Sequence, residues 1–212
     1  MIDLPKISNI AEIKNMLKNK KTSILFDQQY NQFAVLLPLV MHKNELCLLF
    51  EVRAKNLTYQ PGEICFPGGQ IEVEDSSPAA AALRETSEEL GINKNNIEMI
   101  GQLNTLLTPF QYRIYPFVAL IKENTLLQPT KAEVDELFFI PLDYLLSCQP
   151  EISYLDINMQ PNENFPYHLV PGGENYPWKS GKYPIYFYTY EHYTVWGITA
   201  RILHHFIELV NR

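Results

Sequence analysis

The stretch Arg84-Glu85-Thr86-Ser87-Glu88-Glu89-Leu90-Gly91-Ile92 carries the most information about the fold of this 212-residue chain. An α-helix turns about 100° per residue. Glu85, Glu88 and Glu89 would therefore share one arc of such a helix, while Leu83 would lie on the opposite side. The pattern predicts a helix with one face in the core and a cluster of carboxylates on the other.

This carboxylate cluster is unfavourable for a helix that stands alone. Glu85 and Glu89 form a like-charge pair four residues apart, which costs about 0.2–0.5 kcal/mol. The cluster also lies near the C-terminal end of the predicted helix, where the helix dipole disfavours anions. A divalent cation would compensate both effects, and three carboxylates with nearby backbone carbonyls suit Mg²⁺ or Mn²⁺. The alternative is an ordinary solvated helix face, which is the commoner meaning of an isolated acidic run.

The boundaries of this helix are marked in the sequence. Ser77-Pro78 offers an N-cap followed by proline at the first helical position, and Gly91 is typical of the residue after a helix end. Upstream, Gly68-Gly69 allows a backbone carbonyl or amide to approach closely because no Cβ intervenes. We therefore expect a glycine turn beside the acidic face.

The glycine turn and the acidic helix together resemble the Nudix hydrolase box. That box is a glycine followed, after a spacer, by R-E-U-x-E-E-x-G-U, where U is apolar; here it covers residues 69–92, with Thr86 at the first U position. The common spacer has 13 residues, whereas 14 separate Gly69 from Arg84. Asp75 consequently stands where the box has its first glutamate.

The enlarged spacer resembles the coenzyme A pyrophosphatase branch of the family, whose members carry the upstream signature L-L-T-x-R-(S/A)-x3-R-x3-G-x3-F-P-G-G. The positions that match this signature are Leu49, Arg53, Ala54, Gly62 and Phe66-Pro67-Gly68-Gly69. The positions that depart from it are Phe50 for the second leucine, Glu51 for the threonine and Thr58 for the second arginine. The change to Thr58 removes a candidate phosphate contact, which nearby Lys55 could replace. Residues 195–203 resemble the W-G-x-T-A-R-I-L ending of the same branch.

The resemblance implies roles for particular residues. The metal ligands would be Glu85, Glu89, Glu88 and the backbone carbonyl of Gly69. The catalytic residues would be Glu88, as third ligand or as the base that positions water, Glu85, and Arg84, which orients the glutamates through an ion pair. The residues that bind substrate would be Arg53, Gly62, Phe66 and Gly68.

The implied activity is the divalent-metal-dependent hydrolysis of the diphosphate bond of coenzyme A or acyl-coenzyme A. The products would be 3′,5′-ADP and 4′-phosphopantetheine or its acyl form. A Mg²⁺ or Mn²⁺ ion is needed because the charged diphosphate repels an attacking hydroxide. Three alternatives stay open: a diphosphatase for ADP-ribose or NADH, an isopentenyl-diphosphate isomerase, and a non-catalytic Nudix-fold ligand sensor. The isomerase is disfavoured because no cysteine lies in the box, and the sensor because the box keeps its acidic residues.

Hydrophobic patterning predicts the order of the other elements. The expected helices cover residues 8–18 with Ser8 as cap, 78–90, 141–146 and 198–210. The expected strands cover residues 33–41 and 45–53 as a hairpin, 64–66, 97–107, 112–121, 135–140, and 185–190 with 193–196 as a second hairpin. Residues 147–182 should form long irregular loops around one or two short strands, because Pro, Gly, Asn and Tyr accumulate there.

This order of elements indicates a mixed α/β sandwich in a single domain. The resemblance makes this expectation more specific: an α/β protein of the Nudix fold, with a mixed β-sheet in an α/β/α sandwich. Residues 1–212 would form one Nudix hydrolase domain, in which residues 1–30 are an N-terminal helical extension.

Composition limits the partners and the location. The 24 acidic and 17 basic side chains give a formal charge of −7, which disfavours nucleic acid and anionic membranes as partners. No apolar run reaches the length of about 18 residues that a membrane span needs. Cys47, Cys65 and Cys148 have no disulfide or metal spacing, which predicts free thiols in a reducing compartment. We expect a cytoplasmic protein that binds a small nucleotide such as coenzyme A, with a second copy of the chain as a further candidate partner in a homodimer.

For several other polar and aromatic residues, both a functional and a structural role are open. Glu133 and Glu136 are candidates for a base supplied by a loop, or for ordinary surface residues. His204-His205 and Glu208 are expected to form a polar surface stripe rather than a metal site. The aromatic residues between Tyr176 and Tyr193 either form core or stack on a substrate. The candidates for phosphate contacts are Arg53, Arg113, Lys179 and Arg201.

Overall fold

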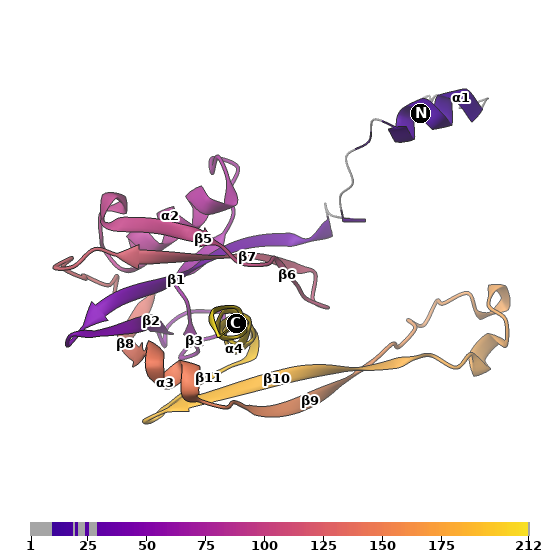
Figure 1. Cartoon of the computed structure of the whole chain (residues 1–212). Helices are drawn as coiled ribbons and strands as arrows, with labels where there is room; N and C mark the ends of the chain where they lie inside the picture. The colour runs from indigo at the N-terminus through magenta and orange to yellow at the C-terminus, as the bar shows by residue number, and fades with distance from the viewer. Residues whose placement is uncertain (1–9, 19, 21–23, 26–28, 212) are drawn as a thin grey trace.

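The computed structural model describes residues 10–18, 20, 24–25 and 29–211 (Figure 1). The first helix, α1, covers Ile10–Lys18 and confirms the helix predicted there, although its expected cap, Ser8, lies outside the described residues. None of the residues of α1 is buried. Among the described residues, no helix has the length and apolar character to cross a membrane.

A mixed eight-stranded sheet forms the centre of the structure. Its strands are β1 (Asn31–His42), β2 (Glu45–Arg53), β3 (Ile64–Cys65), β4 (Gly68–Gln70), β5 (Ile97–Gln102), β6 (Leu106–Leu107), β7 (Tyr112–Ile121) and β8 (Val134–Pro141). Five of them lie in the order β3-β2-β1-β7-β5, while β4 pairs with β1, β6 with β7 and β8 with β2. β1 and β7 run parallel and the other described pairs of this sheet are antiparallel, so the predicted mixed sheet is confirmed.

β1 and β2 form the hairpin that their two apolar runs predicted. Lys43 and Asn44 connect the strands with φ angles of 51° and 65°, the left-handed conformation that a tight two-residue hairpin turn requires. Successive side chains of a strand point to opposite faces of the sheet. Leu36 and Leu37 of β1 accordingly pack in two different hydrophobic cores, one on each face.

Helix α2 (Pro78–Glu89) packs on one face of the sheet, against β1 and β4. The Ser77 side chain accepts a hydrogen bond from the Ala80 N–H at 3.2 Å, which caps the first turn. Gly91, with a φ of +61°, follows the helix, and a Cβ there would lie 2.1 Å from the Gln128 carbonyl oxygen. The predicted start and end of this helix are therefore confirmed.

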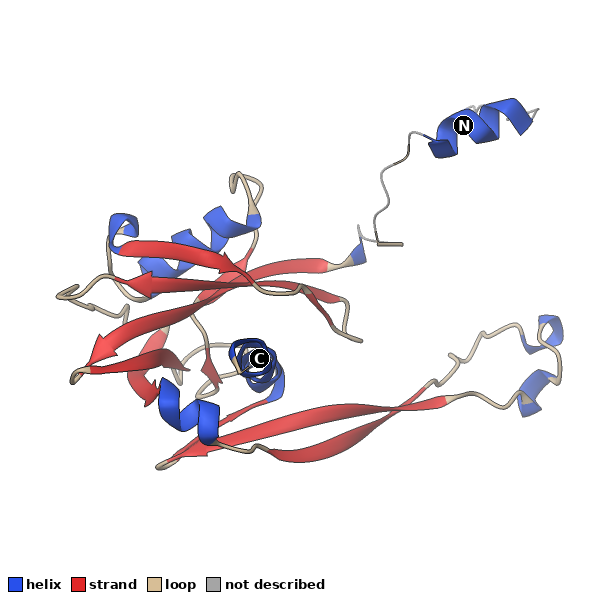
Figure 2. Cartoon of the chain, in the orientation of Figure 1, coloured by secondary structure: helices blue, strands red, loops and turns tan. Residues whose placement is uncertain are grey.

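Helix α4 (Gly197–Val210) covers the other face of the sheet, as Figures 1 and 2 show. Its buried residues Ile202 and Phe206 share a core with Leu37 of β1. The sheet is therefore enclosed between α2 and α4, which confirms the predicted α/β/α sandwich. The short helix predicted before the tyrosine-rich segment is also present, as α3 (Leu142–Ser147).

The strand expected over residues 97–107 is divided in the structure. Its two parts, β5 and β6, pair separately with β7. The register of β5 against β7 shifts between Met99 and Gly101, so the segment does not continue as one regular strand.

Residues 147–182 are more regular than predicted. β9 (Glu151–Asn158) pairs along its whole length with β10 (Ser180–Tyr190), and β11 (Tyr193–Trp196) completes a three-stranded sheet. The short 3-10 turns η3 (Tyr167–Leu169) and η4 (Gly173–Asn175) lie between β9 and β10. All residues of β9 are exposed. β9 is one of the one or two short strands expected among these loops, and the second hairpin begins earlier than predicted, because β10 starts at Ser180.

Candidate functional site

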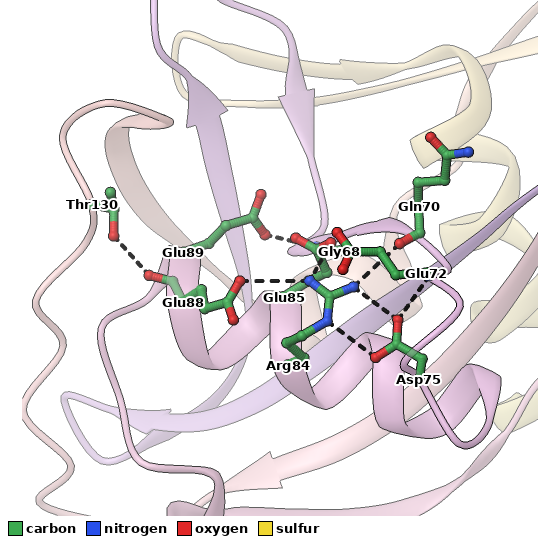
Figure 3. A network of polar contacts seen from close by, with 9 residues as sticks. All are labelled: Gly68, Gln70, Glu72, Asp75, Arg84, Glu85, Glu88, Glu89 and Thr130. Atoms are coloured by element: carbon green, nitrogen blue, oxygen red, sulfur yellow. Dashed lines mark hydrogen bonds and ion pairs between the residues drawn. The ribbon is translucent and has the colours of Figure 1, made fainter.

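The three glutamates of the box project from one face of α2 (Figure 3). They differ in burial. Glu89 is 5% exposed, whereas the side chains of Glu85 and Glu88 are 18% and 60% exposed. The cluster therefore extends from the solvent at Glu88 to the protein interior at Glu89.

Glu89 is held by the glycine turn. The Gly68 N–H donates a hydrogen bond to Glu89 Oε2 at 2.8 Å. Gly68 has a φ of +149°, and a Cβ there would lie 2.3 Å from the Ala34 carbonyl oxygen of β1. A glycine is therefore required for this backbone N–H to lie between β1 and Glu89. Burial raises the pKa of Glu89, and the nearby charge of Glu51 raises it further.

The backbone of Gly69 lies directly against the carboxylate of Glu85. A Cβ at Gly69 would be 2.4 Å from Glu85 Oε1. Burial raises the pKa of Glu85, while the hydrogen bond from Arg84 opposes this shift. The expected glycine turn beside the acidic face is thus confirmed. The role of the Gly69 carbonyl as a ligand stays a prediction.

Arg84 connects the spacer of the box to the acidic face (Figure 3). Its Nε and Nη2 donate to the two carboxylate oxygens of Asp75 at 3.1 and 2.9 Å, and its Nη1 donates to Glu85 Oε1 at 2.8 Å. Nη2 also donates to the Gln70 carbonyl oxygen at 3.3 Å, and Nη1 lies 3.6 Å from Glu88 Oε2. The hydrogen bonds from Arg84 lower the pKa of Asp75 to about 2. This arrangement is the one that an arginine orienting two glutamates would need.

Glu51 on β2 is a second fully buried carboxylate, with an exposed fraction of 1%. Its Oε1 accepts a hydrogen bond from the Cys65 thiol at 3.2 Å. Its Oε2 has no hydrogen-bond partner in the part of the chain that the structure describes. Burial raises the pKa of Glu51; the Cys65 hydrogen bond and the charge of Arg53 lower it, and the charge of Glu133 raises it.

The sequence marked Glu51 only as a departure from the upstream signature. It follows Leu48, Leu49 and Phe50, which are fully buried in the same strand. A glutamate is almost never fully buried without a partner. A charged residue inside this apolar strand is therefore the signal that could have identified Glu51 as part of the site.

The residues present fit a divalent cation. Glu51 and Glu89 are buried, and neither forms an ion pair with a lysine or arginine among the described residues. Burying unpaired carboxylates is costly, and a hard cation with oxygen ligands such as Mg²⁺ or Mn²⁺ would offset that cost. In the described part of the chain, no three carboxylate, thiol or imidazole groups converge tightly enough to hold an ion as they stand. The partly exposed Glu85 and Glu88 lie on the same face of α2 and would supply the further carboxylate ligands.

Arg53 and Gly62 lie together at the turn that follows β2. The Gly62 N–H donates to the Arg53 carbonyl oxygen at 3.0 Å, and Gly62 has a φ of +75°. Arg53 Nη2 donates to the Tyr59 carbonyl oxygen at 3.4 Å. Arg53 Nε is buried and has no partner among the described residues. The role of Arg53 as a phosphate contact stays a prediction.

Phe66 and Lys55 form no hydrogen bond or ion pair with the box glutamates among the described residues. Phe66 is 3% exposed, and its ring stacks on Phe50 with the centroids 4.8 Å apart. It supports the glycine turn from the core and presents little surface to a substrate. Lys55, the candidate replacement for an arginine at the exposed Thr58, has its Nζ 3.5 Å from Asp135.

Glu133, just before β8, and Glu136, within β8, differ in their surroundings. The charge of Glu133 raises the pKa of the glutamates on α2 and β2, so this residue lies close enough to act on the cluster. Glu136 instead accepts a hydrogen bond from the Tyr193 hydroxyl at 2.5 Å. The role of either residue as a base supplied from outside the box stays a prediction.

Comparison with known proteins identifies the family of the chain. The model of the NUDIX domain matches residues 31–155. The peroxisomal coenzyme A diphosphatase NUDT7 of Mus musculus is 37% identical over 138 residues, which cover 65% of this chain and 58% of that protein. The Nudix hydrolase NudL of Photorhabdus laumondii is 32% identical, over 84% of this chain and 83% of the other. Among solved structures, a MutT/nudix family protein from Enterococcus faecalis matches with a TM-score of 0.48 and 17% identity, over 98% of this chain and 71% of that chain.

The matched domain includes the upstream signature, the glycine turn and the acidic helix. The match to NudL extends beyond the box to most of both chains. The chain therefore belongs to the Nudix hydrolase family.

Proposed function

We propose that the protein is a divalent-metal-dependent diphosphatase that hydrolyses coenzyme A or acyl-coenzyme A to 3′,5′-ADP and 4′-phosphopantetheine or its acyl form. The observation that carries the proposal is the pair of buried carboxylates, Glu89 and Glu51, beside the glycine turn. That turn ends the coenzyme A signature. The mouse relative described as a coenzyme A diphosphatase supports the choice of substrate.

Glu85, Glu89, Glu88 and the Gly69 carbonyl are the proposed metal ligands, and Glu51 adds a carboxylate from β2. A Mg²⁺ or Mn²⁺ ion held by them would offset the charge of the diphosphate and lower the pKa of the attacking water. The burial of Glu51 and Glu89 supports this set, because neither carboxylate forms an ion pair among the described residues.

The other residues of the site orient the reacting groups. Arg84 holds Glu85 through a hydrogen bond of 2.8 Å and is itself held by both carboxylate oxygens of Asp75. These contacts restrict the rotamers of Glu85, so Arg84 acts as a positioning residue. Glu88, whose side chain is 60% exposed, is the proposed acceptor of the proton from the attacking water, with Glu133 as the second candidate.

Arg53 is the proposed contact for a substrate phosphate. A guanidinium with unused N–H donors suits phosphate oxygens, and the buried Nε of Arg53 is such a donor. Gly62 closes the turn over Arg53, and Gly68 holds Glu89. Phe66 contributes by supporting this loop from the core.

A comparison of substrates tests the proposal. The protein is incubated with Mg²⁺ and with coenzyme A, ADP-ribose or NADH, and kcat/KM is measured while the products are identified. Coenzyme A should be preferred, because the upstream signature is that of the coenzyme A branch. Preferred hydrolysis of ADP-ribose or NADH would instead support the alternative diphosphatase, and no hydrolysis of the three would support the ligand sensor.

We also propose a cytoplasmic location and a homodimer. The three cysteines are free, which fits a reducing compartment. The name of the mouse relative places that relative in the peroxisome, so localisation of a tagged chain decides between the two compartments. Light scattering of the purified protein at micromolar concentration decides between monomer and dimer.

A further inference from the structure

A cavity of about 250 Å³ lies on the face of the sheet that α4 covers. Its walls come from the segment Asn104–Leu106, from Pro116 of β7, from Tyr186 of β10 and from α4, which supplies Arg201 and His205. The box glutamates project from α2, which packs on the opposite face. The cavity is therefore distinct from the candidate metal centre.

Two polar side chains of α4 have unused donors or acceptors at this cavity. Arg201 Nη1 and His205 Nε2 are buried and have no hydrogen-bond partner among the described residues. The guanidinium carbon of Arg201 lies 4.5 Å from the ring centroid of Tyr183, whose buried hydroxyl likewise lacks a described partner. The contact with the ring does not neutralise the charge of Arg201, because an aromatic ring carries no net charge.

The acidic residue in the cavity lining does not compensate Arg201. Glu208 pairs instead with His204 Nε2 at 3.7 Å, and its side chain is 59% exposed. His204 is further engaged by the Tyr188 hydroxyl, 2.7 Å from its Nδ1, and by stacking on Tyr186. In the described part of the chain, Arg201 forms no ion pair.

These positions also correct the expectation of a polar surface stripe on the last helix. His204 and His205 are half-buried at the cavity, and only Glu208 of that group is exposed. Water fits into a cavity of this size but carries no charge that would offset Arg201.

We propose that this cavity binds an anionic group, a phosphate monoester or a carboxylate, through Arg201 and His205. Both anions accept the paired N–H donors that a guanidinium presents. The volume lies below the range of about 300–1,000 Å³ that is typical of whole-ligand pockets. The cavity therefore accommodates the charged end of a ligand rather than a complete nucleotide. The proposal does not depend on the diphosphatase activity.

The test uses the full chain, stripped of metal by a chelating resin, so that the box glutamates bind no cation. Inorganic phosphate, acetate and 3′,5′-ADP are titrated by calorimetry, which distinguishes phosphate, carboxylate and nucleotide-linked phosphate. At least one should bind saturably. Arg201→Gln should weaken that binding by at least about tenfold, because a charge-assisted hydrogen bond is lost.

Lys182→Gln is the matched control. Lys182 belongs to β10, and its Nζ lies 5.9 Å from the ring centroid of Tyr154, outside the cavity. Like Arg201→Gln, the substitution removes one positive charge. It should leave binding unchanged. An equal loss in both variants, or binding that survives Arg201→Gln, would overturn the proposal.

The wild-type protein supplies a readout that needs no substitution. The imidazole NMR signals of His205 should shift on titration with the anion that binds. The midpoint of this shift should equal that of the calorimetric curve. Binding without any change at His205, or the failure of all three anions to bind at millimolar concentration, would also overturn the proposal.

Discussion

Glu51 and Glu89 determine the electrostatic balance of the candidate metal centre. They are 1% and 5% exposed and belong to different elements, β2 and α2. Replacing either one relieves repulsion in the metal-free protein but also removes an oxygen donor. The stability of the metal-free protein and its affinity for a divalent cation should therefore change in opposite directions.

Glu51→Gln and Glu51→Thr test whether stability and cation affinity change in opposite directions. Threonine is the residue that the coenzyme A signature has at this position. Both variants should melt at a higher temperature than the wild type without metal. Both should bind Mn²⁺ about tenfold or more weakly in calorimetry, because a charged oxygen donor is lost. Glu98→Gln, on the exposed side of β5, is the control and should alter neither property. Unchanged Mn²⁺ affinity in both Glu51 variants would exclude Glu51 from the metal centre.

The raised pKa values of Glu51 and Glu89 predict the pH dependence of stability. A glutamate in an unfolded chain titrates near about pH 4.3. Above that pH the folded state binds more protons than the unfolded state, so the free energy of unfolding of the metal-free protein should fall as the pH rises through the folded pKa values. Thermal melts at a series of pH values measure this slope.

Two controls test whether the glutamates cause this dependence of the free energy of unfolding on pH. Glu89→Gln should reduce it, because one of the two groups no longer titrates. Mg²⁺ should flatten it in the wild type, since bound metal stabilises the ionised carboxylates. If the melting temperature of the metal-free protein instead rises with pH above about pH 4.3, the assignment of the two raised pKa values is contradicted.

The glycine turn and α2 form the site by close contact between two elements. Gly68 N–H reaches Glu89, and the backbone of Gly69 touches the carboxylate of Glu85. Neither contact leaves room for a Cβ. The turn consequently fixes both the burial of Glu89 and the position of Glu85.

Gly69→Ala should lower kcat by about tenfold or more, because the added Cβ would lie 2.4 Å from Glu85 Oε1 and the carboxylate must move from its position. The loss of stability should be small, since the displaced group ends a flexible side chain. Gly101→Ala is the matched control, because a Cβ there meets no atom within 4 Å. Equal activity of the two variants would show that the contact between Gly69 and Glu85 is not needed.

Elements with local signals in the sequence were predicted correctly. Ser77, Pro78 and Gly91 delimit α2 by capping and by backbone conformation, which depend on neighbouring residues alone. The hairpin of β1 and β2 has two apolar runs around a short turn. A short strand was expected near β9, but its bounds and partner were not predicted, because they depend on backbone pairing with β10, about thirty residues along the chain.

In the candidate site too, local patterns were predicted correctly, whereas contacts between distant segments were not. The helical period places Glu85, Glu88 and Glu89 on one arc, but it cannot show which of them is buried, because the turn at Gly68 comes from another part of the sheet. Glu51 was missed for a related reason. Its proximity to Glu89 follows from the packing of α2 on the sheet, and no pattern along the chain encodes that distance.

Over the whole molecule, the formal charge of −7 includes a local concentration of acidic residues at one place in the fold. Glu51, Glu85, Glu88 and Glu89 belong to this concentration, which would repel an anionic diphosphate. Bound divalent cations reverse the local sign. The same surface then attracts the substrate, so the proposed activity requires metal.

Product analysis of coenzyme A tests this requirement most directly. Coenzyme A is incubated with metal-stripped protein, with and without added Mg²⁺ or Mn²⁺, and the products are separated and identified by mass. The wild type should release equal amounts of 3′,5′-ADP and 4′-phosphopantetheine only when metal is present, and Glu89→Gln should release at least about 100-fold less. Intact coenzyme A in the presence of metal, or the same products in its absence, would contradict the account.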